Sequence, residues 1–253
     1  LVEKDTLYMH GKKIIVSGPQ EDRVIRAFNN VRFYKSDMSG KCDSLHSNNK
    51  TQLTKMIGKP ILWNNENQMT GDVMHLIGNN KTQKLDSLKV LNNAFIIQKD
   101  SLSKNGYNQI KGQNLYGKFV DSKLKEVDVV KNAEVIYYMR NDAQELIGIN
   151  KNVSSKINLI IEKNEIETIT FFQQVDGDIF PEKDLPENAR KLRGLVWRGD
   201  ERIKSKDDIF PPEENEDNEK IAKATKSAEA KENVPMKVRK ETLNYKKKKK
   251  RNK

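Results

Sequence analysis

The sequence predicts an all-β fold made of repeated pairs of short antiparallel strands, and three observations support this class. Apolar runs of four to six residues, rich in Val, Ile, Phe, Tyr and Trp, alternate with polar clusters of Asn, Gly, Asp and Lys. Helical i, i+3, i+4 periodicity is absent over residues 1–172. The same phrase also recurs, since KVLNNAF and DVVKNAE align at a spacing of 39 residues.

Each repeat has the pattern of a strand, a corner and a second strand. The corners fall at Asn30, Lys59, Asn93 and Asn132, at spacings of 29, 34 and 39 residues. A Gly-containing turn is expected after each second strand, at Gly40, Gly71, Gly112 and Gly148. The expected strands are 24–28, 31–35, 53–57, 61–64, 87–91, 94–98, 126–130, 134–139 and 168–172.

The apolar positions of these strands form columns that share one face of the sheet. Successive side chains of a strand point to opposite faces, so residues two apart lie on the same side. After the corners the column contains Val31, Phe33, Pro60, Leu62, Ala94, Ile96, Ala133 and Val135. Before the corners it contains Ala27, Met56, Val90, Val129 and Phe171. One such unit is too small to bury its own apolar face, so stacking is required to make a continuous stripe.

The residues alone leave the role of this stripe open. It has the period-2 signature of a packed sandwich core and equally that of an open apolar groove. A neighbouring column on the opposite face, formed by Tyr34, Trp63, Ile97 and Ile136, is also apolar. Both faces are therefore expected to be covered in part.

Composition divides the chain into three regions. Residues 1–172 carry the repeats, residues 173–212 are expected to form a segment that closes the last repeat, and residues 213–253 are expected to be a disordered basic tail. The tail holds 14 Lys or Arg against 8 Asp or Glu, which is 6 of the net charge of +11. Because the sequence begins at Leu1, we expect earlier repeats and a targeting signal to precede it.

The sequence contains few residues that could bind a metal or catalyse a reaction. The three histidines, His10, His46 and His75, end similar phrases and have no ligand spacing, so no metal or other cofactor is predicted. A Gly-rich phosphate loop, a nucleophile elbow and a Cys/His dyad are absent from the sequence, and Cys42 is the single cysteine. We therefore predict that the protein is not an enzyme.

Several stretches resemble the OstA-like proteins of Bacteroidetes-type bacteria, which belong with the LptA family and the N-terminal domain of LptD. They are AFNNVRFYKSDMSGKCDSLH (27–46), GKPILWNNENQMTGD (58–72), IETITFFQQVDGDIFPEKDL (166–185) and LRGLVWRGDERIKSKDDIF (192–210). The resemblance implies an open β-jellyroll, also called a β-taco, whose apolar groove holds acyl chains. It implies a periplasmic bridge protein, with outer-membrane association left open, that carries lipopolysaccharide by its lipid A. The expected partners are other jellyroll-containing transport components or copies of the chain, joined end to end by β-stacking.

With this resemblance, the lipid-binding candidates are the column residues. They are Val31, Phe33, Met56, Leu62, Val90, Ile96, Val129, Val135 and Phe171. The alternative function is a β-repeat scaffold or polyanion-binding protein acting through its Lys-rich tail, whose charge could contact an anionic surface. Specific nucleic-acid binding is not expected, because residues 1–212 lack a basic stripe with interleaved aromatics.

Overall fold

The structure is a computed structural model, and it describes residues 6–64, 66–82, 84–121, 123–163 and 165–211. The chain divides into two units, residues 1–210 and 211–253. Every described strand belongs to the first unit. The predicted disordered tail, 213–253, lies outside the described residues.

The described chain contains fourteen β-strands and five short 3₁₀ turns, and no α-helix occurs within these ranges. The strands are β1 (Tyr8–His10), β2 (Lys13–Ser17), β3 (Val24–Lys35), β4 (Met38–Asn48), β5 (Leu53–Ile57), β6 (Ile61–Asn64), β7 (Asn67–Thr70), β8 (Val73–Gly78), β9 (Leu85–Lys99), β10 (Tyr107–Val120), β11 (Lys123–Arg140), β12 (Leu146–Glu162), β13 (Glu165–Phe172) and β14 (Asp176–Phe180). The 3₁₀ turns are η1 (Gln20–Asp22), η2 (Glu182–Asp184), η3 (Glu187–Arg190), η4 (Gly199–Glu201) and η5 (Asp207–Ile209). The all-β prediction is confirmed.

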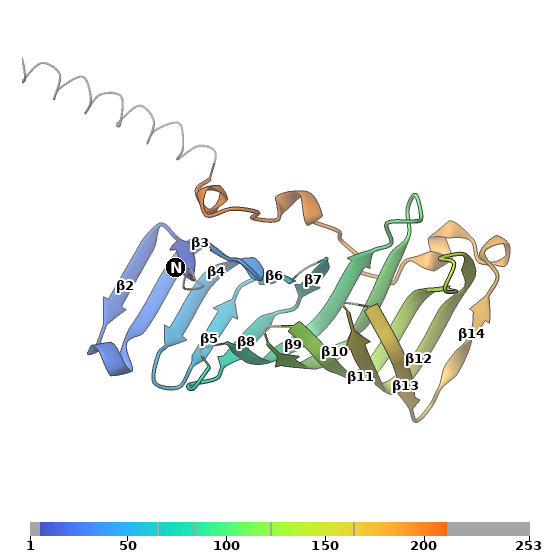
Figure 1. The fold of residues 1–253 in the computed structure, drawn as a ribbon, viewed down its shortest axis with the longest axis horizontal. Coiled ribbons are helices and arrows are strands. Elements are labelled where there is room, and N and C mark those ends of the chain that lie inside the picture. The colour runs from blue at the N-terminus through green and yellow to red at the C-terminus, as the bar shows by residue number, and fades with distance from the viewer. Residues whose placement is uncertain (1–5, 65, 83, 122, 164, 212–253) are drawn as a thin grey trace, which may run out of the picture. The chain divides into compact units, whose positions relative to one another are not determined.

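All described strands belong to one antiparallel sheet, in which pairs of short strands lie beside the long strands β3, β4 and β9 to β12 (Figure 1). The main path runs β1-β3-β4-β5-β8-β9-β10-β11-β12-β13. The corners, where the long strands bend, lie on one line across the sheet. The short strands lie on either side of this corner line: β5 pairs with β8 on one side, and β6 pairs with β7 on the other. We call the side with β2, β5, β8 and β13 the first half-sheet, and the side with β1, β6, β7 and β14 the second half-sheet.

Left-handed backbone conformations make the corners. Asn29 and Asn30 have φ of 64° and 57°, and Asn92 and Asn93 repeat this at 58° and 51°. The other corners use 58–59, 131–132 and 173–174, again with positive φ at both residues. Asn tolerates this region better than most residues do, which explains why it recurs here.

Each corner also adds one residue to its strand. In β3, residues 28 and 31 pair with residues 44 and 42 of β4, so three steps on one strand oppose two on the other. The same bulge occurs in β9 against β10 and in β11 against β12. A bulge bends its strand and raises the local twist. Aligned bulges therefore fold the whole sheet along one line.

All nine predicted strands lie within observed strands, and the two strands of most repeats are halves of one longer strand. The predicted turns at Gly40, Gly112 and Gly148 are wrong. Gly40, Gly112 and Gly148 lie inside β4, β10 and β12, and Gly71 lies between β7 and β8. A side chain would not fit at these positions. A Cβ on Gly112 would come within 2.4 Å of Val129 Cγ1, and one on Gly71 within 2.3 Å of Val90 Cγ1. These glycines leave room for inward-facing side chains of neighbouring strands.

The fold buries two apolar clusters, one on each face of the sheet. The inner cluster takes side chains from both half-sheets, so the sheet is folded over its own inner face, as expected for an open β-jellyroll. The outer cluster lies on the second half-sheet, where Phe95, Ile97, Ile136, Tyr138 and Ile149 pack with residues from beyond the strands.

The outer cluster is covered by residues 181–210, which we call the strap. It leaves β14 and runs back across the second half-sheet toward β1 (Figure 1). Leu185 and Leu192 join the outer cluster, and the Phe210 ring lies 5.2 Å from the ring of His10. The sequence predicts that residues 173–212 close the last repeat. In the structure 176–180 add a strand to the sheet, and the strap extends back over the earlier repeats, because its apolar residues match the outer column.

Two buried glutamines hold the strap. Gln109 Nε2 donates to the carbonyl of Arg190 at 2.8 Å, and Gln109 Oε1 accepts from the Leu192 amide at 2.8 Å. Gln68 repeats this arrangement with the carbonyl of Val196 and the amide of Arg198, both at 2.7 Å. Each side chain thus imitates a backbone amide and satisfies strap groups that would otherwise be buried unpaired.

We predict that Asn132→Val destabilises the protein by about 1–2 kcal/mol. A β-branched residue strongly disfavours the left-handed φ of 52° at this position. Urea unfolding measures the loss, and Asn132→Gly is the control, since glycine adopts this conformation freely. Equal stability of the Val and Gly variants would contradict this role of the corner.

We predict that Gln109→Leu releases the middle of the strap. The change leaves the Arg190 carbonyl and Leu192 amide buried without partners, at about 1–3 kcal/mol for each group. Hydrogen exchange should show faster exchange of the Leu192 amide. Gln113→Leu, at an exposed glutamine, is the matched control and should leave this exchange unchanged.

Candidate functional site

The structure brings the nine predicted lipid-binding residues together in the interior of the folded sheet. Val31, Phe33, Met56, Leu62, Val90, Ile96, Val129 and Val135 belong to the inner cluster, and Phe171 packs against it. Pro60 differs from the rest of its column, since it borders a pocket on the outer face. That these residues bind lipid stays a prediction.

The interior is packed with side chains. Val31, Met56, Leu62 and Val90 have no exposed surface, and Ile96 is 6% exposed. Methionine is frequent in it, with Met38, Met56, Met69 and Met74 all buried. Met side chains are unbranched and flexible, so they repack more readily than branched ones do. The interior is thus filled but adaptable.

Two hollows lie between the half-sheets. The larger, of about 230 Å³, is lined by Phe33 and Met38 of the second half-sheet and by Leu45 and Leu76 of the first. The other is much smaller and joins Ile96 and Ile110 to Leu124 and Ile166. Phe33 and Ile96 are therefore the predicted residues that border unfilled space.

Many interior residues lie outside the predicted set, and most of them belong to the strands that return from one corner strand to the next. They include Leu45, Met69, Met74, Leu115, Phe119, Ile157, Leu159 and Ile161. Their signal in the sequence is strict alternation, for example at Ile157, Leu159 and Ile161 of β12. The repeated phrase does not reveal them, because the return strands lack the corner that marks it.

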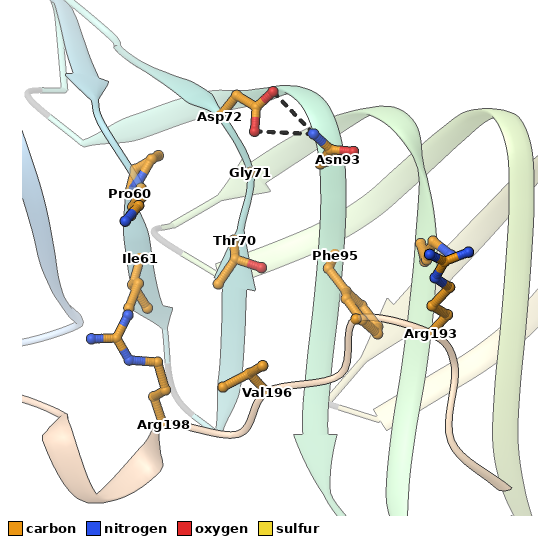
Figure 2. A pocket seen from close by; sticks show the side chains of 13 residues that line it. Pro60, Ile61, Thr70, Gly71, Asp72, Asn93, Phe95, Arg193, Val196 and Arg198 are labelled. Atoms are coloured by element: carbon orange, nitrogen blue, oxygen red, sulfur yellow. Dashed lines mark hydrogen bonds between the residues drawn. The ribbon is translucent and has the colours of Figure 1, made fainter.

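A second site, not predicted from the sequence, lies between the strap and the outer face of the second half-sheet (Figure 2). It is a pocket of about 450 Å³. Residues 59–61, 70–72, 93, 95 and 111 of the sheet line it on one side, and 193, 194, 196 and 198 of the strap on the other. We call it the strap pocket.

Charged groups beside this pocket are partly neutralised. Lys111 Nζ lies 3.0 Å from Glu134 Oε1, and the Arg198 guanidinium pairs with Glu201 at 2.6 Å. The hydrogen bond from Arg198, with help from Lys41, lowers the pKa of Glu201 to about 2. This carboxylate stays ionised and joins strap to sheet through Lys41 at 3.0 Å.

The pKa values of Cys42 and His75 are shifted by their surroundings. Burial raises the pKa of the Cys42 thiol to about 12, so it stays protonated at neutral pH. Desolvation, together with the charges of Lys55 and Lys89, lowers the pKa of His75. Across the described ranges, no group of three or more His, Cys, Asp or Glu residues could hold a metal ion. Nor does any helix in these ranges have the length and apolar character to cross a membrane.

We predict that Ile96→Asp lowers the free energy of unfolding by several kcal/mol, because it places a carboxylate among apolar side chains. Ile147→Asp is the matched control, since Ile147 is 59% exposed, and its effect should be small. Chemical unfolding compares the two. If Ile96→Asp keeps nearly full stability, water reaches this position and the interior is an open groove.

Comparison with known proteins gives a family match and related solved structures, of which one is described below. The model of the family described as "LptA/(LptD N-terminal domain) LPS transport protein" matches residues 1–84. No curated protein matches the chain. The crystal structure of LptH, described as the LptA homologous periplasmic component of the conserved lipopolysaccharide transport device from Pseudomonas aeruginosa, is 15% identical, with a TM-score of 0.43. That match covers 58% of this chain and 99% of LptH.

The family match covers the first corners of the repeat. The same corner geometry recurs at 92–93, 131–132 and 173–174, beyond the matched residues. Residues 1–84 are therefore the part of the chain that is similar to the family described as LptA and LptD N-terminal domain lipopolysaccharide transport proteins.

Proposed function

We propose that this protein is a non-enzymatic periplasmic carrier of lipopolysaccharide, which shields lipid A acyl chains in the interior of its folded sheet. The single observation that supports this most is the length of the inner cluster. It runs without interruption from Ala27 of β3 to Ile161 of β12. The sheet path between them crosses several strands at about 4.8 Å each, so the apolar interior is elongated, as an acyl chain requires.

The corners supply a way to admit such a chain. At each corner strand the two half-sheets are joined by a pair of left-handed residues, and across the interior they meet through apolar side chains. Dispersion contacts of this kind are non-directional and can be exchanged for contacts with a lipid. Spreading of the half-sheets about the corner line would let acyl chains enter beside Phe33 and Ile96, where the hollows lie.

The edges of the sheet suit end-to-end stacking. Within the described residues, β1 and β2 pair only with β3 at one end, and β13 and β14 pair only with β12 at the other. Unpaired strand edges are templates for another strand. We propose that a jellyroll-containing transport component or a second copy of the chain pairs there. We also propose that the protein belongs to the OstA-like group of Bacteroidetes-type bacteria.

Photo-crosslinking tests the interior as the lipid site. We expect p-benzoylphenylalanine at Phe33, which borders the larger hollow, to crosslink to fluorescent lipopolysaccharide. Tyr116 is the matched control, because it is an aromatic residue on the outer face and is 39% exposed. Equal or stronger labelling from Tyr116 would contradict the proposal.

The Lys-rich tail provides the competing explanation, in which polyanion attraction captures the lipid. Removal of residues 213–253 should leave crosslinking from Phe33 unchanged if the interior holds the acyl chains. Loss of crosslinking on removal of the tail, with the melting curve unchanged, would support the scaffold or polyanion-binding function instead.

A further inference from the structure

We propose that the strap pocket binds a small organic anion, of the phosphomonoester or carboxylate class, that carries a compact apolar body. The pocket lies on the opposite face of the sheet from the inner cluster. Ligand binding there is therefore independent of the lipid role of the interior.

The pocket exists because the strap bends away from the sheet between the two places where Gln109 and Gln68 hold it. Gln109 holds residues 190 and 192, and Gln68 holds residues 196 and 198. Between them the Leu195 amide donates to the Leu192 carbonyl at 3.1 Å, and Gly194 has φ of 96°. A Cβ on Gly194 would have no atom within 4 Å, so this turn stands clear of the sheet.

The walls of the pocket are largely apolar. Ile61 and Phe95 point into it from the sheet, and Val196 faces it from the strap (Figure 2). Val196 is 59% exposed although it lies against a concave surface. An apolar side chain exposed inside a cavity can gain by burial against a ligand, at about 25 cal/mol for each Å² covered.

The charges at its rim favour an anion. Four cations line the pocket, Lys59, Lys111, Arg193 and Arg198, against one carboxylate, Asp72. Asp72 accepts two hydrogen bonds from Asn93, at 3.1 and 3.0 Å, and so already has a neutral donor (Figure 2).

The four cations differ in their pairing. Lys111 and Arg198 are paired with Glu134 and Glu201. The side chains of Lys59 and Arg193, by contrast, make no hydrogen bond or ion pair with any residue that the structure describes. They stand on opposite sides of the pocket, one at a corner of the sheet and one on the strap. An anion between them would gain two cationic partners at once.

The volume limits the ligand. About 450 Å³ is within the range of small-molecule sites, which is about 300–1,000 Å³. Phosphate alone would leave the exposed Val196 side chain uncovered, and a neutral apolar molecule would leave the cations unused. Phenyl phosphate presents both features and is the probe of choice.

The test is a titration of the full-length, ¹⁵N-labelled protein with phenyl phosphate, followed by NMR. The amides of Gly71 and Gly194 line opposite walls of the pocket and should shift together and saturate. The double variant Lys59→Gln with Arg193→Gln should raise the dissociation constant at least tenfold. The control, Lys13→Gln with Lys123→Gln, removes the same charge from exposed positions on the first half-sheet and should bind as the unaltered protein does.

Three results would overturn the inference: shifts spread over surface lysines outside the pocket, equal binding by the Lys59 and Arg193 double variant, or equal affinity for inorganic phosphate. Vesicles distinguish the source of the anion. Displacement of phenyl phosphate by vesicles containing phosphatidic acid, but not by phosphatidylcholine alone, would assign the site to a lipid headgroup. Displacement by neither would assign it to a soluble anion.

Discussion

The whole structure depends on the backbone conformation of the corners. Two successive left-handed residues and one extra residue bend each long strand, and the sheet folds only because these bends lie on one line. If one corner lost its bulge, the residues beyond it would shift by one position. Every apolar side chain of that half-strand would then move from the interior to the outer face. The inner and outer clusters are therefore both consequences of where the bulges fall.

The two faces of the second half-sheet are stabilised in different ways. Its inner face packs against apolar side chains of the first half-sheet, in a cluster made of hydrophobic residues. Its outer face is covered by a chain segment that makes no regular ladder with the strands. There, Gln68 and Gln109 supply directed hydrogen bonds, and Lys151 adds one to the Ala189 carbonyl at 2.9 Å. The contrast fits the proposed function, in which the interior exchanges its contacts for those with a lipid while the cover keeps its register.

The corner strands and their inward columns could be predicted from the sequence, because the repeated phrase contains both the Asn corner and the flanking apolar pattern. The return strands could not be found in this way, since they carry Gly and polar residues that are typical of turns. The path of the strap could not be predicted from the sequence either. Its apolar residues are separated by prolines and charges, and the partners of its backbone are single glutamines in β7 and β10. Nothing local in the sequence distinguishes these glutamines from exposed ones such as Gln113.

The two glutamines that hold the strap link the width of the sheet to the length of the strap. Gln109 and Gln68 lie in β10 and β7, which are separated by β9 alone, and their contacts on the strap are six residues apart, at 190 and 196. An inserted repeat would widen the sheet by two strands, or about 10 Å. The strap would then have to be about six residues longer, so that the residues beyond the insertion keep their contacts with the sheet. Variation in the number of repeats should therefore occur in discrete steps, with paired insertions at two distant places in the chain.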